Sequence, residues 1–128
     1  MKKVFFIEDD PLIIRMYERI LRLNKFEFMI STNGEDGLKT LREGKFFPDI
    51  ILLDIMMPHM NGLQVIEELK KDEKLSDIPI VVLTNLSAGE ESRQKALDLG
   101  AELFLIKSQC SPQKIAEVVG SIIKKHKK

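Results

Sequence analysis

The chain has 128 residues, of which 44% are hydrophobic and 31% are charged, and this predicts one domain spanning residues 1–128 with a substantial core. Twenty basic side chains balance twenty acidic ones, so no overall field favours direct binding to nucleic acid or to an anionic membrane. The single cysteine, Cys110, cannot form an internal disulfide, and no apolar run approaches the ~20 residues of a membrane span. We therefore expect a cytoplasmic protein without membrane insertion. The sequence leaves open the alternative that the chain is a piece cut from a longer protein.

Five short apolar runs punctuate the chain, and polar or turn-forming residues follow each of them. Short, nearly continuous runs of this kind are typical of strands that are buried on both faces of a parallel sheet. The five predicted strands occupy residues 4–7, 26–30, 50–53, 80–83 and 103–106.

Between the runs, apolar residues recur at the spacing of amphipathic helices. The first such stripe consists of Leu12, Ile13, Met16, Ile20 and Leu23. The segment from 90 to 99 is the poorest in apolar residues, so we expect its helix to be the least firmly buried. Asp10-Pro11 and Ser111-Pro112 predict helix starts, whereas Gly44 and Gly100 predict helix ends.

Strands that alternate with helices in this way define the fold class. Five βα repeats predict an α/β domain with a parallel sheet, right-handed crossovers and helices on both faces. No repeat, low-complexity tract or linker suggests a second unit.

Polar residues follow four of the predicted strands at the point where each one ends. Glu8, Asp9 and Asp10 follow the first strand, Asp54 the third, Thr84 the fourth and Lys107 the fifth. Because the carboxyl ends of parallel strands share one edge of a sheet, we expect these side chains to meet. Asp10 directly precedes Pro11, so a capping role is favoured for it over a metal-binding role.

This combination of side chains predicts a phosphoryl site. Clustered carboxylates repel one another unless a cation intervenes, and Mg²⁺ prefers oxygen ligands together with phosphate oxygens. Thr84 offers a hydroxyl donor and Lys107 a compact positive charge for phosphoryl oxygens. Asp54 is then either a further metal ligand or a nucleophile, since carboxylates can form aspartyl phosphates.

Four motifs carry a resemblance that covers essentially the whole chain: FIEDDP, DIMMPHMNG, VVLTN and GAELFLIK. In this order and spacing they resemble the response-regulator receiver domain of two-component signalling, of the same class as the single-domain chemotaxis regulator. The resemblance implies a doubly wound, flavodoxin-like sheet of five strands in the order 2-1-3-4-5.

The resemblance also implies a role for each site residue. Asp54 would be the phosphoacceptor and would take its phosphoryl group from a phosphohistidine on a histidine kinase or histidine phosphotransfer protein. Asp9, Asp54 and the Met56 backbone carbonyl would bind Mg²⁺, with Glu8 acting through water. Lys107 would pair with the phosphoryl group, or with Asp54 before phosphorylation. The domain would promote only its own phosphorylation and dephosphorylation, and would not be an enzyme in the usual sense.

The same resemblance implies a conformational switch. Thr84 would move toward the phosphoryl group, and Phe104 would turn inward into the space that Thr84 leaves. This movement would change the surface made by the helix around residues 90–99, the strand at residues 103–106 and the helix that begins at Pro112, where a downstream target protein would bind. The resemblance leaves open whether phosphorylation also causes the chain to form a homodimer.

Several positions depart from the family pattern. Ser108 follows Lys107 where the family usually has a proline after a cis bond, so the bond here is either trans or a costly cis bond. Asn85 replaces a smaller residue beside Thr84. Met56 and Leu86 are apolar and should hinder an attacking water, which predicts slow self-hydrolysis of the phosphoryl group.

Two other classes of function compete with the receiver interpretation. A Mg²⁺-dependent phosphohydrolase would usually place an acid two residues after its aspartyl nucleophile, where this chain has Met56. A scaffold that works without phosphate would not need Glu8, Asp9, Asp54, Thr84 and Lys107 together. His59, His126 and Cys110 are interpreted as structural residues.

Overall fold

The computed structural model describes residues 2–85 and 89–126. All strand pairs are parallel, and the strand order is β2-β1-β3-β4-β5. This confirms the predicted doubly wound, flavodoxin-like fold with five helices. The strands are β1 (Lys3–Ile7), β2 (Glu27–Ser31), β3 (Ile50–Leu53), β4 (Ile80–Thr84) and β5 (Leu103–Ile106). The helices are α1 (Pro11–Leu23), α2 (Gly34–Glu43), α3 (Gly62–Lys71), α4 (Gly89–Leu99) and α5 (Pro112–His126), and a short 3-10 helix spans Lys107–Gln109.

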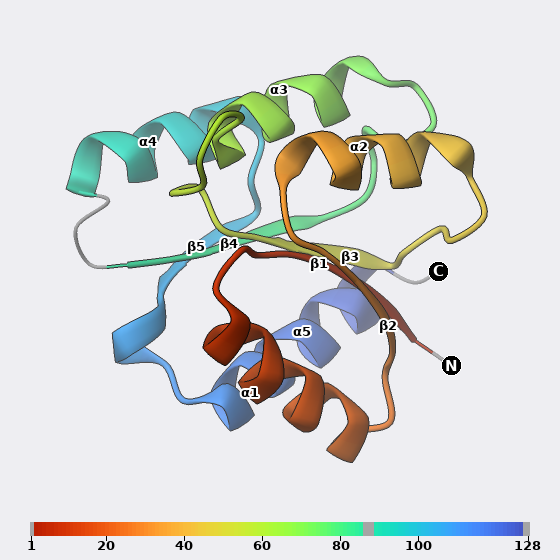
Figure 1. The fold of residues 1–128 in the computed structure, drawn as a ribbon, viewed down its shortest axis with the longest axis vertical. Helices are drawn as coiled ribbons and strands as arrows, with labels where there is room; N and C mark the ends of the chain where they lie inside the picture. The colour runs from red at the N-terminus through yellow and green to blue at the C-terminus, as the bar shows by residue number, and fades with distance from the viewer. Residues whose placement is uncertain (1, 86–88, 127–128) are drawn as a thin grey trace.

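The helices form two layers, one on each face of the sheet (Figure 1). α1 and α5 cover one face, and α2, α3 and α4 cover the other. Strand side chains alternate between the layers, as the pleat requires. Phe6 packs on the α1 and α5 side, whereas Phe5 and Ile7 pack on the side of α2, α3 and α4. The three central strands are therefore apolar on both faces.

The two edge strands differ from the prediction, which had all five strands buried on both faces. In β2, Glu27 and Met29 are exposed, and in β5 only Phe104 is buried. Each of these strands is flanked by only one neighbour in the sheet, so the helical layers cover it less completely than they cover the centre.

Helix α1 buries only part of the stripe that its sequence suggested: Ile13 and Ile20 pack against the core, but the other three members are exposed. Leu12, Met16 and Leu23 are 69%, 47% and 69% exposed, whereas Tyr17 and Leu21 are buried. The Tyr17 ring lies 5.3 Å from that of Phe6 on β1. Charged residues occupy one side of α1, and the middle of the opposite, apolar side packs against the sheet, so residues at the margin of the apolar side stay exposed.

The predicted helix ends agree with the structure. The Asp10 side chain accepts a hydrogen bond from Leu12 N at 2.9 Å, and Ser111 Oγ accepts one from Lys114 N at 3.1 Å. α2 ends before Gly44 and α4 before Gly100, both with positive φ. α4 buries only Ala96, which confirms that it is the helix with the smallest buried face.

The structure also answers two questions raised by the sequence, on the peptide bond after Lys107 and on membrane-spanning helices. The peptide bonds of the described residues are all trans, including the bond from Lys107 to Ser108. Within residues 2–85 and 89–126, no helix is long and apolar enough to cross a membrane.

Candidate functional site

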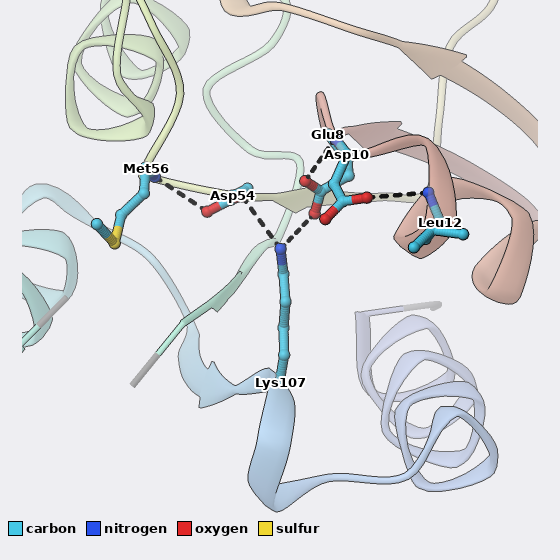
Figure 2. A network of polar contacts seen from close by, with 6 residues as sticks. All are labelled: Glu8, Asp10, Leu12, Asp54, Met56 and Lys107. Carbon is cyan, nitrogen blue, oxygen red and sulfur yellow. Dashed lines mark hydrogen bonds and ion pairs between the residues drawn. The ribbon is translucent and has the colours of Figure 1, made fainter. Parts of the chain in front are cut away.

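The carboxyl ends of β1, β3, β4 and β5 bring Glu8, Asp54, Thr84 and Lys107 to one edge of the sheet. Glu8 directly follows β1, Asp54 directly follows β3, Thr84 ends β4 and Lys107 directly follows β5. Figure 2 shows that Lys107 reaches across this edge, with its ammonium between Asp54 and Glu8. The predicted convergence of the strand ends is thus present.

Lys107 forms two buried ion pairs rather than the one that was expected. Its Nζ lies 2.5 Å from Glu8 Oε1 and 3.1 Å from Asp54 Oδ2. The side chains of Lys107 and Glu8 are 9% and 0% exposed. The sequence analysis missed the direct contact of Lys107 with Glu8. The signal that could have found it is the choice of Glu over the shorter Asp.

The loop after β3 fixes the Asp54 carboxylate from its other side. Asp54 Oδ1 accepts a hydrogen bond from Met56 N at 2.9 Å, while Asp54 N donates to Ile7 O at 3.1 Å. A Cβ on Gly62 would lie 2.6 Å from Ile55 Cα and 2.7 Å from Asp54 O. Glycine is therefore needed where α3 begins, because the Asp54 loop passes so close to it.

The pKa values of Glu8 and Lys107 are both raised, for different reasons. Burial raises the pKa of Glu8 to about 7, although the hydrogen bond from Lys107 lowers it. Burial alone would lower the pKa of Lys107, but its hydrogen bond to Glu8 and the charge of Asp54 outweigh burial and raise it. Lys107 is therefore a firmly charged cation in the pocket.

Three carboxylates form a group that suits a hard cation. Oxygen atoms of Glu8, Asp9 and Asp54 lie within 4.8 Å of one another, and Asp9 is exposed to solvent. Asp10, in contrast, caps α1 and donates its backbone N–H to Glu8 Oε2 at 3.2 Å, so its predicted capping role is confirmed. An all-oxygen donor set fits Mg²⁺ better than a soft metal.

The two residues expected to move are both buried in this structure. Thr84 has no exposed surface, and among the described residues its Oγ1 has no hydrogen-bond partner. Phe104 is 8% exposed and packs in the cluster on the side of α2, α3 and α4. The Phe104 side chain is thus buried in this structure, and its movement on phosphorylation stays a prediction.

The remaining candidate residues that the structure describes lie in loops or, for His126, at the end of α5. His59 has a positive φ of 66° in the loop before α3, and His126 Nε2 contacts Glu102 Oε1 at 2.7 Å. Cys110 is half-buried after the 3-10 helix. Asn85 is exposed after β4, and Leu86 lies outside the described residues.

Comparison with known proteins agrees with this geometry. Residues 4–120 match the family model of the response regulator receiver domain. The chain is 30% identical over 118 residues to the polar-differentiation response regulator DivK of Brucella anthropi, covering 91% of this chain and 93% of that protein. It is 33% identical over 125 residues to the probable transcriptional regulator ycf27 of Pyropia yezoensis, covering 97% of this chain and 48% of that protein. The chain thus spans about half the length of this second relative.

A solved structure gives the same assignment. The phosphorylated cyanobacterial phytochrome response regulator RcpA superposes with a TM-score of 0.82 at 30% identity, covering 94% of this chain and 90% of that one. The chain belongs to the response-regulator receiver family of two-component signalling. Receiver domains are signalling modules that interact with histidine kinases and with downstream effectors.

Proposed function

We propose that this chain, residues 1–128, is a single receiver domain in which Asp54 is the phosphoacceptor. The observation that carries the proposal is the setting of the Asp54 carboxylate, which Lys107 Nζ contacts from one side and Met56 N from the other. These contacts hold a buried carboxylate in one orientation at the edge of the sheet. Orientation of a nucleophile in this way removes entropy from the barrier for attack.

The transfer is a simple exchange of bonds at phosphorus. An Asp54 oxygen forms a new bond to the phosphorus of a phosphohistidine, and the bond from phosphorus to the imidazole nitrogen breaks. The electron pair of that bond stays on the imidazole, which carries a proton on its other ring nitrogen or takes one from water, and so leaves as neutral histidine. Lys107 is placed to hold the charge on the transferring oxygens, and Thr84 to donate its hydroxyl hydrogen to one of them.

The charges of the pocket support a divalent cation. Glu8, Asp9 and Asp54 carry three negative charges and Lys107 one positive charge, which leaves a net charge of about −2 when all are ionised. We propose Mg²⁺ as the cofactor, held by Asp9, Asp54 and the Met56 backbone carbonyl, with Glu8 at the edge of its water shell. Bound there, the cation supplies charge for phosphoryl oxygens.

The conformational change that we propose reaches the surface of α4, β5 and α5. Thr84 ends β4, and the chain continues from it to α4, the helix that buries only Ala96. A shift of Thr84 toward a phosphoryl oxygen would therefore move a weakly packed helix. We propose that the surface of α4, β5 and α5 binds a downstream target protein or a second phosphorylated copy, and does not bind nucleic acid directly.

The donor in this proposal is a histidine kinase or a histidine phosphotransfer protein in the cytoplasm. The chain acts on its own phosphoryl group only, so it does not turn over a separate substrate. Met56 stands where a phosphohydrolase would carry its second acid, and this makes the enzyme alternative the weaker one.

The proposal is tested by incubation with acetyl phosphate, with Mg²⁺ or with EDTA, followed by intact-mass measurement. We expect a Mg²⁺-dependent gain of ~80 Da in the wild type that is absent in Asp54→Ala. Lys39→Ala, at an exposed position on α2, is the matched surface control and should gain the same mass. A gain that persists in Asp54→Ala would assign the phosphoryl group to another residue.

A further inference from the structure

The Lys107 ammonium has its shorter contact with Glu8, not with the proposed phosphoacceptor. Nζ lies 2.5 Å from Glu8 Oε1 and 3.1 Å from Asp54 Oδ2. The Glu8 side chain is fully buried, and its second oxygen, Oε2, accepts a hydrogen bond from Asp10 N at 3.2 Å. Both oxygens of Glu8 are thus engaged, one by the backbone at the start of α1 and one by the lysine.

This arrangement holds a flexible side chain in a defined place. A lysine has four rotatable carbon bonds and loses up to about 2 kcal/mol of rotamer entropy when it is fixed. Lys107 is the first residue of the 3-10 helix after β5, so its side chain has to extend across the site to reach Glu8 and Asp54. Two carboxylates, one from β1 and one from β3, fix the ammonium from two directions (Figure 2).

The length of the Glu8 side chain decides whether this contact exists. An aspartate at this position would be shorter by one carbon bond of ~1.5 Å. Its oxygen would then lie beyond hydrogen-bond range of Nζ unless the lysine moved. Asp54 would be left as the one direct partner of the ammonium.

We propose that Glu8 is a positioning residue that holds the Lys107 ammonium beside Asp54, ready for the phosphoryl oxygens, and that this requires a glutamate. The inference rests on the proposed function and deepens it, because it assigns Glu8 a role in addition to contact with the water molecules of a bound metal ion. Glu8 touches neither the phosphoryl donor nor the reacting oxygen. It acts through Lys107.

The first experiment compares Glu8→Asp and Glu8→Gln with the wild type in phosphorylation by acetyl phosphate at saturating Mg²⁺, with the Mg²⁺ affinity measured separately by calorimetry. Both variants should react more slowly, by on the order of tenfold, which is the usual effect of losing a partner that orients an active-site group. The acetyl phosphate concentration at half-maximal rate should not change. Glu8→Asp should keep the Mg²⁺ affinity of the wild type, because it keeps the charge.

A role limited to the metal gives the opposite result. Glu8→Asp would then react at the wild-type rate, and the rate of Glu8→Gln would recover fully at saturating Mg²⁺. Either result would overturn the proposal. Glu117→Gln, an exposed position on α5, is the matched control for loss of a carboxylate charge.

The second experiment needs neither metal nor phosphate. A double-mutant cycle of Glu8→Gln and Lys107→Met in EDTA, measured by chemical denaturation, should show a coupling of at least about tenfold in the unfolding equilibrium constant. Additive effects would show that the two residues do not interact in solution. If the wild type takes up no phosphoryl group, the proposed function fails, while this cycle still decides whether Glu8 holds Lys107.

Discussion

The Glu8 carboxylate lies nearer to the Lys107 ammonium than the Asp54 carboxylate does, at 2.5 Å against 3.1 Å. All three side chains are almost completely shielded from water. When Glu8 is ionised, one positive charge therefore faces two buried negative charges, and the pocket has an excess of negative charge that a cation can offset. We expect this imbalance to make the site respond to pH, to divalent ions and to the loss of any one of the three groups.

The first prediction concerns pH. Burial raises the pKa of Glu8 from 4.5 to about 7, so the folded protein holds a proton on Glu8 that the unfolded chain releases. Between about pH 4.5 and pH 7, the free energy of unfolding of the wild type should therefore fall relative to Glu8→Gln as the pH rises, by at most ~1.4 kcal/mol per pH unit. Urea denaturation in EDTA across this range measures the difference. A difference that stays constant with pH would contradict the shift.

The second prediction concerns the metal. Mg²⁺ that binds only the folded state should stabilise the protein by about 2.7 kcal/mol at a concentration of 100 times Kd. Asp9→Asn should lose most of this stabilisation, because Asp9 is one of the three clustered carboxylates. Asp10→Asn is the matched control, since it removes a neighbouring charge but asparagine caps a helix as well as aspartate does. Equal responses of the two variants in thermal unfolding with and without Mg²⁺ would argue against Asp9 as a ligand.

The strands, the helices and the parallel α/β class followed from the sequence because strands and helix ends carry local signals, whereas the strand order was implied only by the family resemblance. Each apolar run became a strand to within one residue at either end, and the proline and glycine residues marked where helices begin and end. The buried stripe of α1 followed only in part. Ile13 and Ile20 pack against the core as predicted. Leu12 and Met16 lie at the margin of the apolar side of the helix and are exposed.

The candidate site, like the fold, could be predicted from the sequence only in part. Glu8, Asp54, Thr84 and Lys107 could be placed together because parallel strands end at one edge. The pairing of Lys107 with Glu8 was missed, because it depends on side-chain length and direction across residues 99 positions apart in the sequence. Its one local signal is the choice of glutamate over the shorter aspartate. The burial of Phe104 is likewise a property of tertiary packing.

The third prediction concerns Gly62, where α3 meets the Asp54 loop. A methyl group there would lie 2.6 Å from the Cα of Ile55 and 2.7 Å from Asp54 O, and backbone atoms cannot yield as a flexible side chain can. We expect Gly62→Ala to destabilise the fold by about 1–3 kcal/mol and to slow phosphorylation. Gly120→Ala is the control: its new methyl group would meet only Phe26 at 3.9 Å, so it should stabilise α5 by up to ~1 kcal/mol. Unchanged stability of Gly62→Ala in denaturant would mean that the loop can shift freely.

The fourth prediction concerns the lifetime of the phosphoryl group. Met56 follows Asp54 by two residues, and its apolar side chain is 46% exposed beside the site. We expect slow loss of phosphate from the purified protein and a severalfold faster loss from Met56→Asn, because an amide can hold a water molecule near the acyl phosphate. Phosphate release after removal of acetyl phosphate measures both rates, and Met29→Asn on β2 is a surface control. Rapid loss from the wild type without a phosphatase would refute the prediction.

The fifth prediction concerns the Thr84 hydroxyl and separates its effect on protein stability from its effect on the conformational response to phosphorylation. The Thr84 hydroxyl is buried, and it has no hydrogen-bond partner among the residues that the structure describes. Such a group costs about 1–3 kcal/mol of desolvation, so Thr84→Val, which replaces the hydroxyl with a methyl group, should stabilise the unphosphorylated protein by a similar amount. The same variant should lose the conformational response to phosphorylation, because it has no hydrogen to donate to a phosphoryl oxygen.

Thr84→Ser is the matched variant for this test. It keeps the hydroxyl but loses a buried methyl group, so it should keep the response while the fold is destabilised by about 1 kcal/mol. Denaturation measures stability, and amide chemical shifts in α4 and β5 before and after addition of acetyl phosphate and Mg²⁺ measure the response. If Thr84→Val were destabilised and still responded, the hydroxyl would be satisfied in solution and would not be the group that senses the phosphoryl oxygen.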